Sequence, residues 1–185
     1  MIRTTEEELQ AIQDLCRGWG HRLELHEGEP EGVWVLYALF LNERYNQDNP
    51  VPRLEKAYCP GGRYYSDRQW KVYGEDSAKS FSNWQIMYPT AFELGYRGMP
   101  HELDDDAVAI RWVVELLNRR IIRRARINDQ VVTLEELLDG YNTGDPADAI
   151  HNHEYVRCGS EHYAQAREII GPAYRGLSAM RYVNQ

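Results

Sequence analysis

The sequence has few cysteines and no long apolar run. Its three cysteines, Cys16, Cys59 and Cys158, are too few and too widely spaced to build a disulfide framework. The longest apolar stretch, residues 33–41, is about half as long as a bilayer-spanning helix. No apolar run follows a basic start, so no signal peptide is visible. We therefore expect synthesis in the cytoplasm, and a separate export route if the target lies outside the cell.

Positive charge is also scarce. The 185 residues include 21 Lys and Arg against 29 Asp and Glu, which leaves a net charge of −8. This balance argues against a nucleic-acid binder, whose surface must attract phosphates. The one basic run lies at the end of an expected helix: Arg119, Arg120, Arg123, Arg124 and Arg126. Because the helix dipole and solvent both favour cations there, we interpret it as a solvated helix face.

The composition is that of an ordinary globular protein, with 43% hydrophobic and 27% charged residues. We predict a single, mainly α-helical domain over residues 1–185. Helices are indicated by apolar periodicity, by capping boxes at Thr5 and Thr133, and by glycine and proline stops. They cover residues 5–17, 32–44, 89–93, 107–125, 133–138 and 160–170. A short β-hairpin is predicted to pair residues 63–65 with 70–73.

Glu43 stands at the end of the most hydrophobic predicted helix. It follows Leu39 by four residues and Phe40 by three, so it shares their buried face. Burial and the partial negative charge of a helix C-terminus both raise the pKa of such a carboxyl. A carboxyl that is protonated near neutral pH can cleave a glycosidic bond as a general acid. The alternative is a helix-end glutamate that turns into water.

Three sequence blocks follow Glu43. Residues 82–95 read Ser-Asn-Trp-Gln-Ile-Met-Tyr-Pro-Thr-Ala-Phe-Glu-Leu-Gly. They resemble the Gly-Leu-Met-Gln-Ile-Met-Pro-Ala-Thr-Ala-x-x-Leu-Gly signature of the soluble lytic transglycosylases, relatives of goose-type lysozyme. Residues 138–144, Leu-Asp-Gly-Tyr-Asn-Thr-Gly, resemble that family's Ala-Ala-Tyr-Asn-Ala-Gly block, and residues 152–156 resemble its Glu-Thr-x-x-Tyr-Val segment. The resemblance spans about residues 32 to 170.

The resemblance implies a lysozyme-like α+β fold, in which a helical domain and a small β-hairpin element border a substrate groove. In this family the catalytic glutamate ends a hydrophobic helix upstream of the first block, which is the setting of Glu43. The implied reaction cleaves the β-1,4 bond between N-acetylmuramic acid and N-acetylglucosamine in peptidoglycan. The substrate-binding residues that the resemblance implies are Gln85, Tyr141, Asn142, Trp84 and Ser82.

Three of these residues have specific implied roles. Gln85 would donate hydrogen bonds to the glycan, and Asn142 would support a turn or a sugar. Tyr141 would orient or tune Glu43 through its hydroxyl, a donor that introduces no second charge. The alternative for Tyr141 is a core aromatic residue whose hydroxyl bonds to the backbone.

The chain also departs from the family pattern. Arg44 stands where the family usually has serine or alanine, and Ser82 replaces the glycine that opens the first block. Asn83 and Trp84 replace leucine and methionine. A long aromatic, glycine-containing excursion, residues 45–80, lengthens the gap after Glu43. The combination is most similar to phage-encoded members, such as virion-associated enzymes or endolysins released through a holin.

The expected reaction is non-hydrolytic, because no residue of the matched blocks stands out as a partner acid for Glu43. The 6-hydroxyl of the muramic acid would attack instead and form a 1,6-anhydro end. One alternative is a hydrolytic muramidase, with a second acid from the excursion: Asp48, Glu55, Asp67, Glu75 or Asp76. Another is a catalytically inactive glycan-binding or structural phage protein. We expect a monomer without cofactor.

Two further groups of residues have competing interpretations. The aromatic residues that are dense between Tyr58 and Tyr88 either stack on sugar rings or fill a small core; they include Tyr64, Tyr65, Trp70, Tyr73 and Trp84. A second group is rich in metal-binding side chains: His151, His153, Glu154, Cys158, Glu161 and His162. Its spacing matches no standard ligand pattern, so we expect no metal site.

Overall fold

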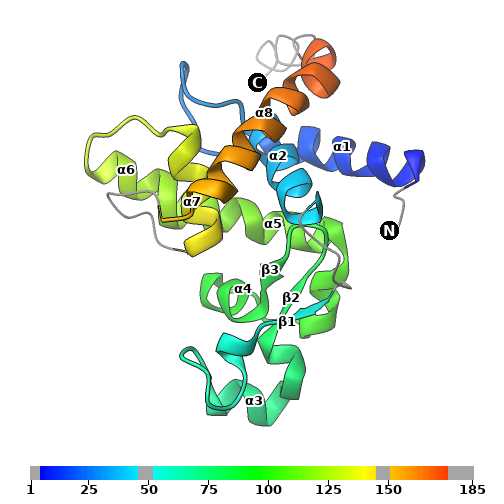
Figure 1. Ribbon diagram of the computed structural model, residues 1–185, viewed down its shortest axis with the longest axis vertical. Coiled ribbons are helices and arrows are strands. Elements are labelled where there is room, and N and C mark those ends of the chain that lie inside the picture. The colour runs from blue at the N-terminus through cyan, green and yellow to red at the C-terminus, as the bar shows by residue number, and fades with distance from the viewer. Residues whose placement is uncertain (1–4, 46–51, 145–150, 175–185) are drawn as a thin grey trace, which may run out of the picture. The chain divides into compact units, whose positions relative to one another are not determined.

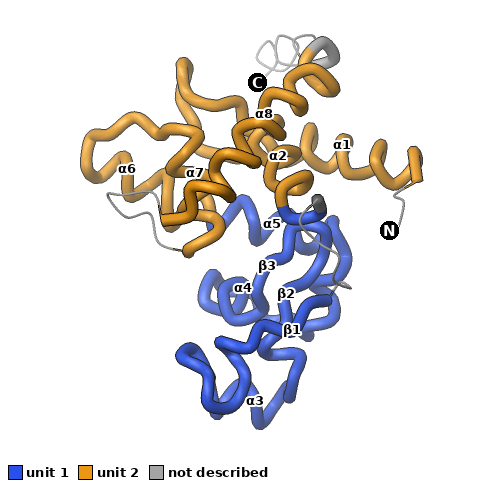
Figure 2. Tube along the Cα trace, in the orientation of Figure 1, with its two compact units in different colours: residues 1, 43–116 blue, residues 2–42, 117–185 orange. Residues whose placement is uncertain are grey.

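The computed structural model describes residues 5–45, 52–144 and 151–174. As predicted, this part of the chain is mainly helical, and it carries a small three-stranded antiparallel sheet (Figure 1). The chain divides into two compact units (Figure 2). Unit 1 contains residues 43–116, and unit 2 contains residues 2–42 and 117–185. Units of this size also occur within one domain, so the single domain stays a prediction.

Helix α1, Glu6–Gly20, begins at the predicted capping box. Thr5 Oγ1 accepts a hydrogen bond from the Glu8 amide at 3.1 Å, and the Glu8 carboxylate accepts one from the Thr5 amide at 2.7 Å. The helix continues past its predicted end and stops where it meets the start of the next helix. A Cβ on Gly20 would lie 2.5 Å from the Val33 nitrogen, so only glycine allows this approach.

Helix α2, Gly32–Tyr45, confirms the helix expected from a run of residues that are apolar on every side. The side chains at position 33 and at positions 35–40 are each at most 2% exposed. Asn42, in the last turn, is fully buried as well, although its side chain is polar. A buried amide is costly unless it is hydrogen-bonded, so Asn42 requires partners of its own.

The long helix predicted over residues 107–125 is present as three consecutive pieces. Helix α5 covers Asp106–Leu116, a π-helical stretch η4 covers Leu117–Ile122, and α6 covers Arg123–Ile127. Apolar periodicity does not predict the π-helical stretch.

Two arginines of the run form ion pairs. Arg123 forms an ion pair with Glu24, and Arg126 forms one with Glu29. Both glutamates belong to the connection between α1 and α2.

Helix α7, Leu134–Thr143, begins at the second predicted capping box, Thr133 and Glu136. Helix α8, His153–Tyr174, is much longer than the predicted helix over residues 160–170, which was wrong at both ends. Asn152 Oδ1 accepts from the Tyr155 amide at 3.1 Å and so caps an earlier start. The helix also passes through Gly171-Pro172, because a proline removes one backbone hydrogen bond without always ending a helix.

The sheet lies in unit 1 and consists of β1, Arg53–Leu54, β2, Lys79–Phe81, and β3, Ile86–Met87. The strands follow one another in the order β1-β2-β3. Ser80 pairs with Arg53 on one side and with Met87 on the other. Strand β2 therefore lies between β1, from the excursion, and β3, from the first sequence block.

The predicted hairpin of residues 63–65 and 70–73 was wrong. Helix α3, Asp67–Tyr73, occupies that segment, between the short 3₁₀ helices η1, Lys56–Tyr58, and η2, Gly74–Ala78. Ser66 caps α3 by accepting from the Gln69 amide at 3.4 Å, and Gly74 ends it with a φ of 58°. These two helix-end signals outweigh the β-preference of the aromatic residues.

Helix α4, Tyr88–Leu94, directly follows β3 and ends at Gly95, whose φ is 115°. This confirms the short helix predicted over residues 89–93 and its glycine stop. The 3₁₀ helix η3, Pro100–Asp104, then leads into α5. The apolar core of unit 1 includes fully buried side chains from β2, β3, α4, η3 and α5: Phe81, Ile86, Tyr88, Leu103 and Ile110.

Candidate functional site

The turn between β2 and β3 is held by the side chain of Gln85. Its Nε2 donates to the Ser82 carbonyl and its Oε1 accepts from Ser80 Oγ, both at 2.8 Å. Ser82 and Gln85 both adopt positive φ angles, 64° and 52°, which are rare outside glycine. A carbonyl oxygen can only accept, so the orientation of the Gln85 carboxamide is determined. The turn is therefore a braced loop of unusual backbone conformation, and such loops are frequent at functional sites.

Glu55 extends this network away from the turn. Its Oε1 lies 3.3 Å from Ser80 Oγ and accepts from Arg53 Nε in an ion pair. The Glu55 side chain is 28% exposed. Ser80 Oγ has a single proton, which points to Gln85 Oε1 at 2.8 Å or to the partly buried Glu55 carboxylate at 3.3 Å, so the two acceptors compete for one donor.

Glu43 lies in the last turn of α2 and is half-buried. The next residue, Arg44, donates from Nη1 to Asn83 Oδ1 at 3.3 Å. Asn83 is part of the turn that Gln85 braces, so the end of α2 contacts that turn within unit 1. The structure therefore brings two features that are 39 residues apart in the sequence to one place.

Asp106, at the start of α5, holds the same turn from another side. The Asn83 amide donates to Asp106 Oδ1 at 3.0 Å, and Asn83 Nδ2 donates to Oδ2 at 2.6 Å. Burial raises the pKa of the Asp106 carboxyl, and the two hydrogen bonds from Asn83 act in the opposite direction. A continuous polar chain therefore links Arg44, Asn83 and Asp106.

The other two sequence blocks meet in unit 2. Asn142, an exposed residue of α7, accepts from Asn152 Nδ2 at 2.9 Å. Asp139 accepts from the amides of His151 and Asn152, each at 3.0 Å. Tyr141 is 8% exposed, which is compatible with both of its predicted roles. Thus Glu43 and Gln85 belong to unit 1, whereas Tyr141 and Asn142 belong to unit 2.

Trp84 and Ser82, two of the predicted substrate-binding residues, are buried. The Trp84 side chain is 0% exposed and Ser82 is 2% exposed. Ser82 Oγ accepts from the Trp84 amide at 3.2 Å, and Asp104 accepts from the Ser82 amide at 3.3 Å. Both residues support the turn in this structure, and neither presents a side-chain surface to a ligand.

The aromatic residues of the excursion largely pack on one another. Ring centroids lie 5.3 Å apart for Tyr58 and Tyr64, and 5.9 Å apart for Tyr65 and Trp70. Tyr73 packs against Tyr88 of α4 with a centroid distance of 5.1 Å. This arrangement favours the small-core interpretation for most of the group. Tyr64 is the exception, because 52% of its surface is exposed.

Most of the rival acids of the excursion behave as surface charges. Asp67 forms an ion pair with Lys71, and Asp76 forms one with Lys79, each at 2.7 Å. Glu75 is exposed, and Asp48 lies outside the described residues. Glu55 differs from these acids because it is hydrogen-bonded to the braced turn.

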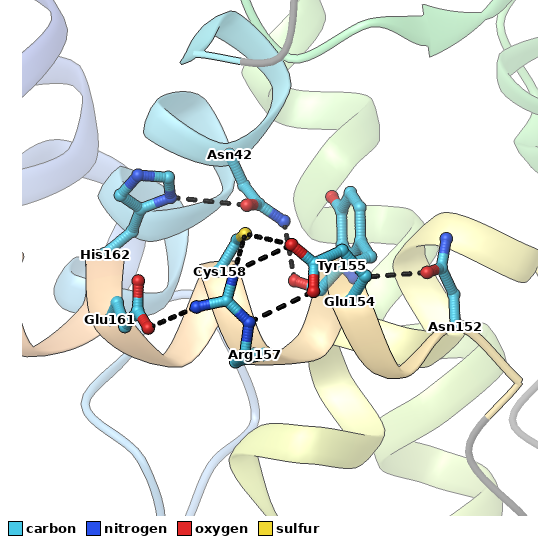
Figure 3. A network of polar contacts seen from close by, with 8 residues as sticks. All are labelled: Asn42, Asn152, Glu154, Tyr155, Arg157, Cys158, Glu161 and His162. Carbon is cyan, nitrogen blue, oxygen red and sulfur yellow. Dashed lines mark hydrogen bonds and ion pairs between the residues drawn. The ribbon is translucent and has the colours of Figure 1, made fainter.

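The possible metal ligands in and just before α8 bond to other partners. His151 bonds to Asp139, while Glu154 and Glu161 both pair with Arg157. His162 Nδ1 lies 3.3 Å from Asn42 Oδ1 (Figure 3). Within the described ranges, no group of three or more His, Cys, Asp or Glu residues could hold a metal ion.

Sequence reasoning did not predict the hydrogen-bond partners of several polar residues in the two units. Asn42 interrupts an otherwise apolar helix, which was a readable signal of a buried hydrogen-bond network. Glu55, Asp106 and His162 gave no such signal, because their partners lie far away in the sequence: Ser80, Asn83 and Asn42.

Among the described helices, none is long and apolar enough to cross a membrane. Comparisons with known protein families, with curated proteins and with solved structures find no match to this chain.

Proposed function

We propose that this chain cleaves the glycan strands of bacterial peptidoglycan, between N-acetylmuramic acid and N-acetylglucosamine, with Glu43 as general acid and base. The fold that accompanies this proposal is lysozyme-like, with the small sheet at the border of a substrate groove. The sequence resemblance motivates the proposal, and the contact between the end of α2 and the β2–β3 turn supports it.

The Arg44–Asn83 hydrogen bond is the observation that carries most weight. A glycosidase of this kind needs its acid beside a loop that positions the sugar. Arg44 adjoins Glu43, and Asn83 lies two residues before Gln85 in the braced turn. Two parts of the sequence pattern are therefore neighbours in space, as a shared site requires.

The proposed chemistry uses a single carboxyl group. Protonated Glu43 gives its proton to the glycosidic oxygen, and the bond to C1 of the muramic acid breaks. The carboxylate left on Glu43 stabilises the resulting oxocarbenium ion and then removes the proton from the 6-hydroxyl of the same sugar. That oxygen attacks C1, so Glu43 is protonated again and a 1,6-anhydro end is formed.

The other residues have supporting roles. Gln85, whose carboxamide is engaged with Ser80 and Ser82, holds the turn in shape and presents the backbone of the turn to the glycan. The role of Tyr141 as a hydroxyl donor rests on the sequence resemblance alone. Asn142 ties α7 to the start of α8. Ser82 and Trp84 support the turn from inside.

A hydrolytic muramidase is the second candidate function, and one observation favours it. Glu55 is a partly buried carboxylate that competes with Gln85 for the Ser80 hydroxyl, so it could orient a water molecule at the turn. In that reaction water, rather than the 6-hydroxyl, would attack C1.

The direct test compares Glu43→Gln with Glu75→Gln in a turbidity assay on purified peptidoglycan. Glutamine keeps the volume of Glu43 but cannot transfer a proton, so Glu43→Gln should lose at least about 100-fold of the activity while remaining folded. Glu75 is exposed in η2, so Glu75→Gln should cleave as the wild type does. A folded wild-type protein without activity would point to the inactive glycan-binding or structural alternative. An active Glu43→Gln protein would refute the assignment of Glu43.

Dialysis against EDTA tests the independence from metal. The proposed reaction needs only a proton donor, so the wild-type rate should be unchanged after dialysis. A loss that zinc restores would contradict the mechanism and redirect attention to His151 and His162.

A further inference from the structure

Asn42 precedes Glu43 directly and is the most deeply buried polar side chain of α2, with 0% exposure. Its Nδ2 donates to the backbone carbonyl of Tyr155 at 3.1 Å, and its Oδ1 faces His162 Nδ1 at 3.3 Å. Tyr155 and His162 are seven residues apart on α8, which is about two helical turns, so both lie on one face. Figure 3 shows the Asn42 side chain reaching from α2 to that face of α8.

The contacts of Asn42 with Tyr155 and His162 form a clamp between α2 and α8, and the direction of each of its hydrogen bonds is determined. The Tyr155 carbonyl can only accept, so the NH₂ group of Asn42 must face it and the Asn42 oxygen must face His162. His162 Nδ1 must therefore carry a proton and donate. Burial lowers the pKa of His162, with Glu161 acting in the opposite direction, which favours the neutral ring.

Helix α8 also holds α7. A Cβ on Gly159 would lie 2.8 Å from Leu138 Cδ1, so the two helices are in close contact there. Gly159 lies between Tyr155 and His162 along the same helix face. In unit 2, one face of α8 therefore supports both the helix that leads to Glu43 and the helix that carries Tyr141.

We propose that Asn42 and His162 are positioning residues for the reaction, because their clamp sets the direction in which the last turn of α2 presents Glu43. This inference rests on the proposed function. A misplacement of a catalytic group by about 1 Å can slow a reaction roughly 100-fold. A change in a buried clamp one residue away should therefore change kcat. In this proposal neither residue contacts the glycan, so KM should not depend on them.

Two substitutions of equal size test the clamp. Asparagine at position 162 places an amide donor on Cγ, where the histidine carries Nδ1, whereas leucine has the same shape without a donor. His162→Leu should lower kcat at least tenfold and leave KM within twofold of wild type, measured on soluble peptidoglycan oligomers. His162→Asn should restore kcat to within about threefold of wild type. The same pair at His153, which is exposed on α8, serves as the control and should have no effect.

Thermal unfolding of each variant separates positioning from stability. Leucine is a better helix former than asparagine, so His162→Leu should be at least about as stable as His162→Asn. Unfolding would then not explain a lower rate of His162→Leu at 25 °C. Equal kcat values for the folded Leu and Asn variants would overturn the clamp, even if Glu43→Gln is inactive. An active Glu43→Gln protein would instead overturn the proposed function. If His162→Leu does not fold, ¹⁵N NMR of the wild type decides: the clamp requires a neutral Nδ1–H tautomer, and an Nε2–H tautomer contradicts it.

Discussion

Arg44 donates a hydrogen bond to Asn83, and both residues are departures from the transglycosylase pattern. A serine or alanine at position 44 would be too short to reach the turn, and a leucine at position 83 could not accept the bond. The two departures therefore form one contact and are best understood as a matched pair. Asn83 also bonds to Asp106, so this contact is part of a longer polar chain.

Replacing Asn83 by leucine should destabilise the protein in a pH-dependent way. The variant loses the Nδ2 donor to Asp106, so the pKa of this buried carboxyl rises further in the folded state. A carboxyl whose pKa is raised in the folded state lowers the stability at pH values above the pKa of the unfolded chain. This loss disappears at lower pH, where the acid is protonated in both states. We expect a loss of about 1–3 kcal/mol in urea unfolding at pH 7 and a smaller loss at pH 4. Asn128→Leu, at an exposed position, is the control; an equal loss at both pH values would contradict this account.

The reaction products distinguish the two proposed mechanisms. Mass spectrometry of digested peptidoglycan should detect 1,6-anhydro ends, because the 6-hydroxyl attacks within the same sugar. Reducing ends without anhydro ends would make the enzyme a muramidase. Glu55→Gln should then abolish activity, whereas Asp67→Asn and Asp76→Asn should not, since those two acids pair with surface lysines.

Glu29 should contribute stability that is lost in acid. Its side chain is 3% exposed and accepts from Arg126 and from the Val132 amide, and the Arg126 guanidinium is the main reason that its pKa falls to about 2. A carboxyl whose pKa is lowered in the folded state adds stability at pH values above its pKa in the unfolded chain, near 4.5. This stability is lost as the pH falls towards 2. Glu29→Gln should therefore lose roughly 2 kcal/mol at pH 7 and almost nothing near pH 2. If the difference in stability between the wild type and Glu29→Gln did not change with pH, the ion pair would not be the source of that difference.

Two glycines should respond to alanine in opposite directions. Gly159→Ala places a methyl group 2.8 Å from the two Cδ atoms of Leu138, so this buried side chain must shift, which should cost about 1–3 kcal/mol. Gly18→Ala, at an exposed position of α1 with open space around it, should instead stabilise by about 0.5–1 kcal/mol. Thermal denaturation of both variants checks this. A neutral Gly159→Ala would contradict this expectation and would mean that Leu138 moves aside without cost.

Local signals in the sequence were sufficient for most of the helices. The capping boxes at Thr5 and Thr133 each involve residues only three positions apart, so they could be recognised without knowledge of the fold. The burial of α2 followed from apolar residues on all of its sides. The placement of Glu43 at the end of that helix was predictable for the same reason.

Tertiary structure decided the strands and the partners of the polar residues. Strands of two or three residues carry almost no periodic signal, and β1 pairs with a strand about 25 residues away, so neither could be recognised locally. The bonds between Arg44 and Asn83, and between Asn42 and His162, join residues 39 and 120 positions apart. The sequence shows which side chains can donate or accept a hydrogen bond, but only the packed chain determines which of them meet. The physical reason is that a buried polar group bonds to the partner that packing brings within about 3 Å.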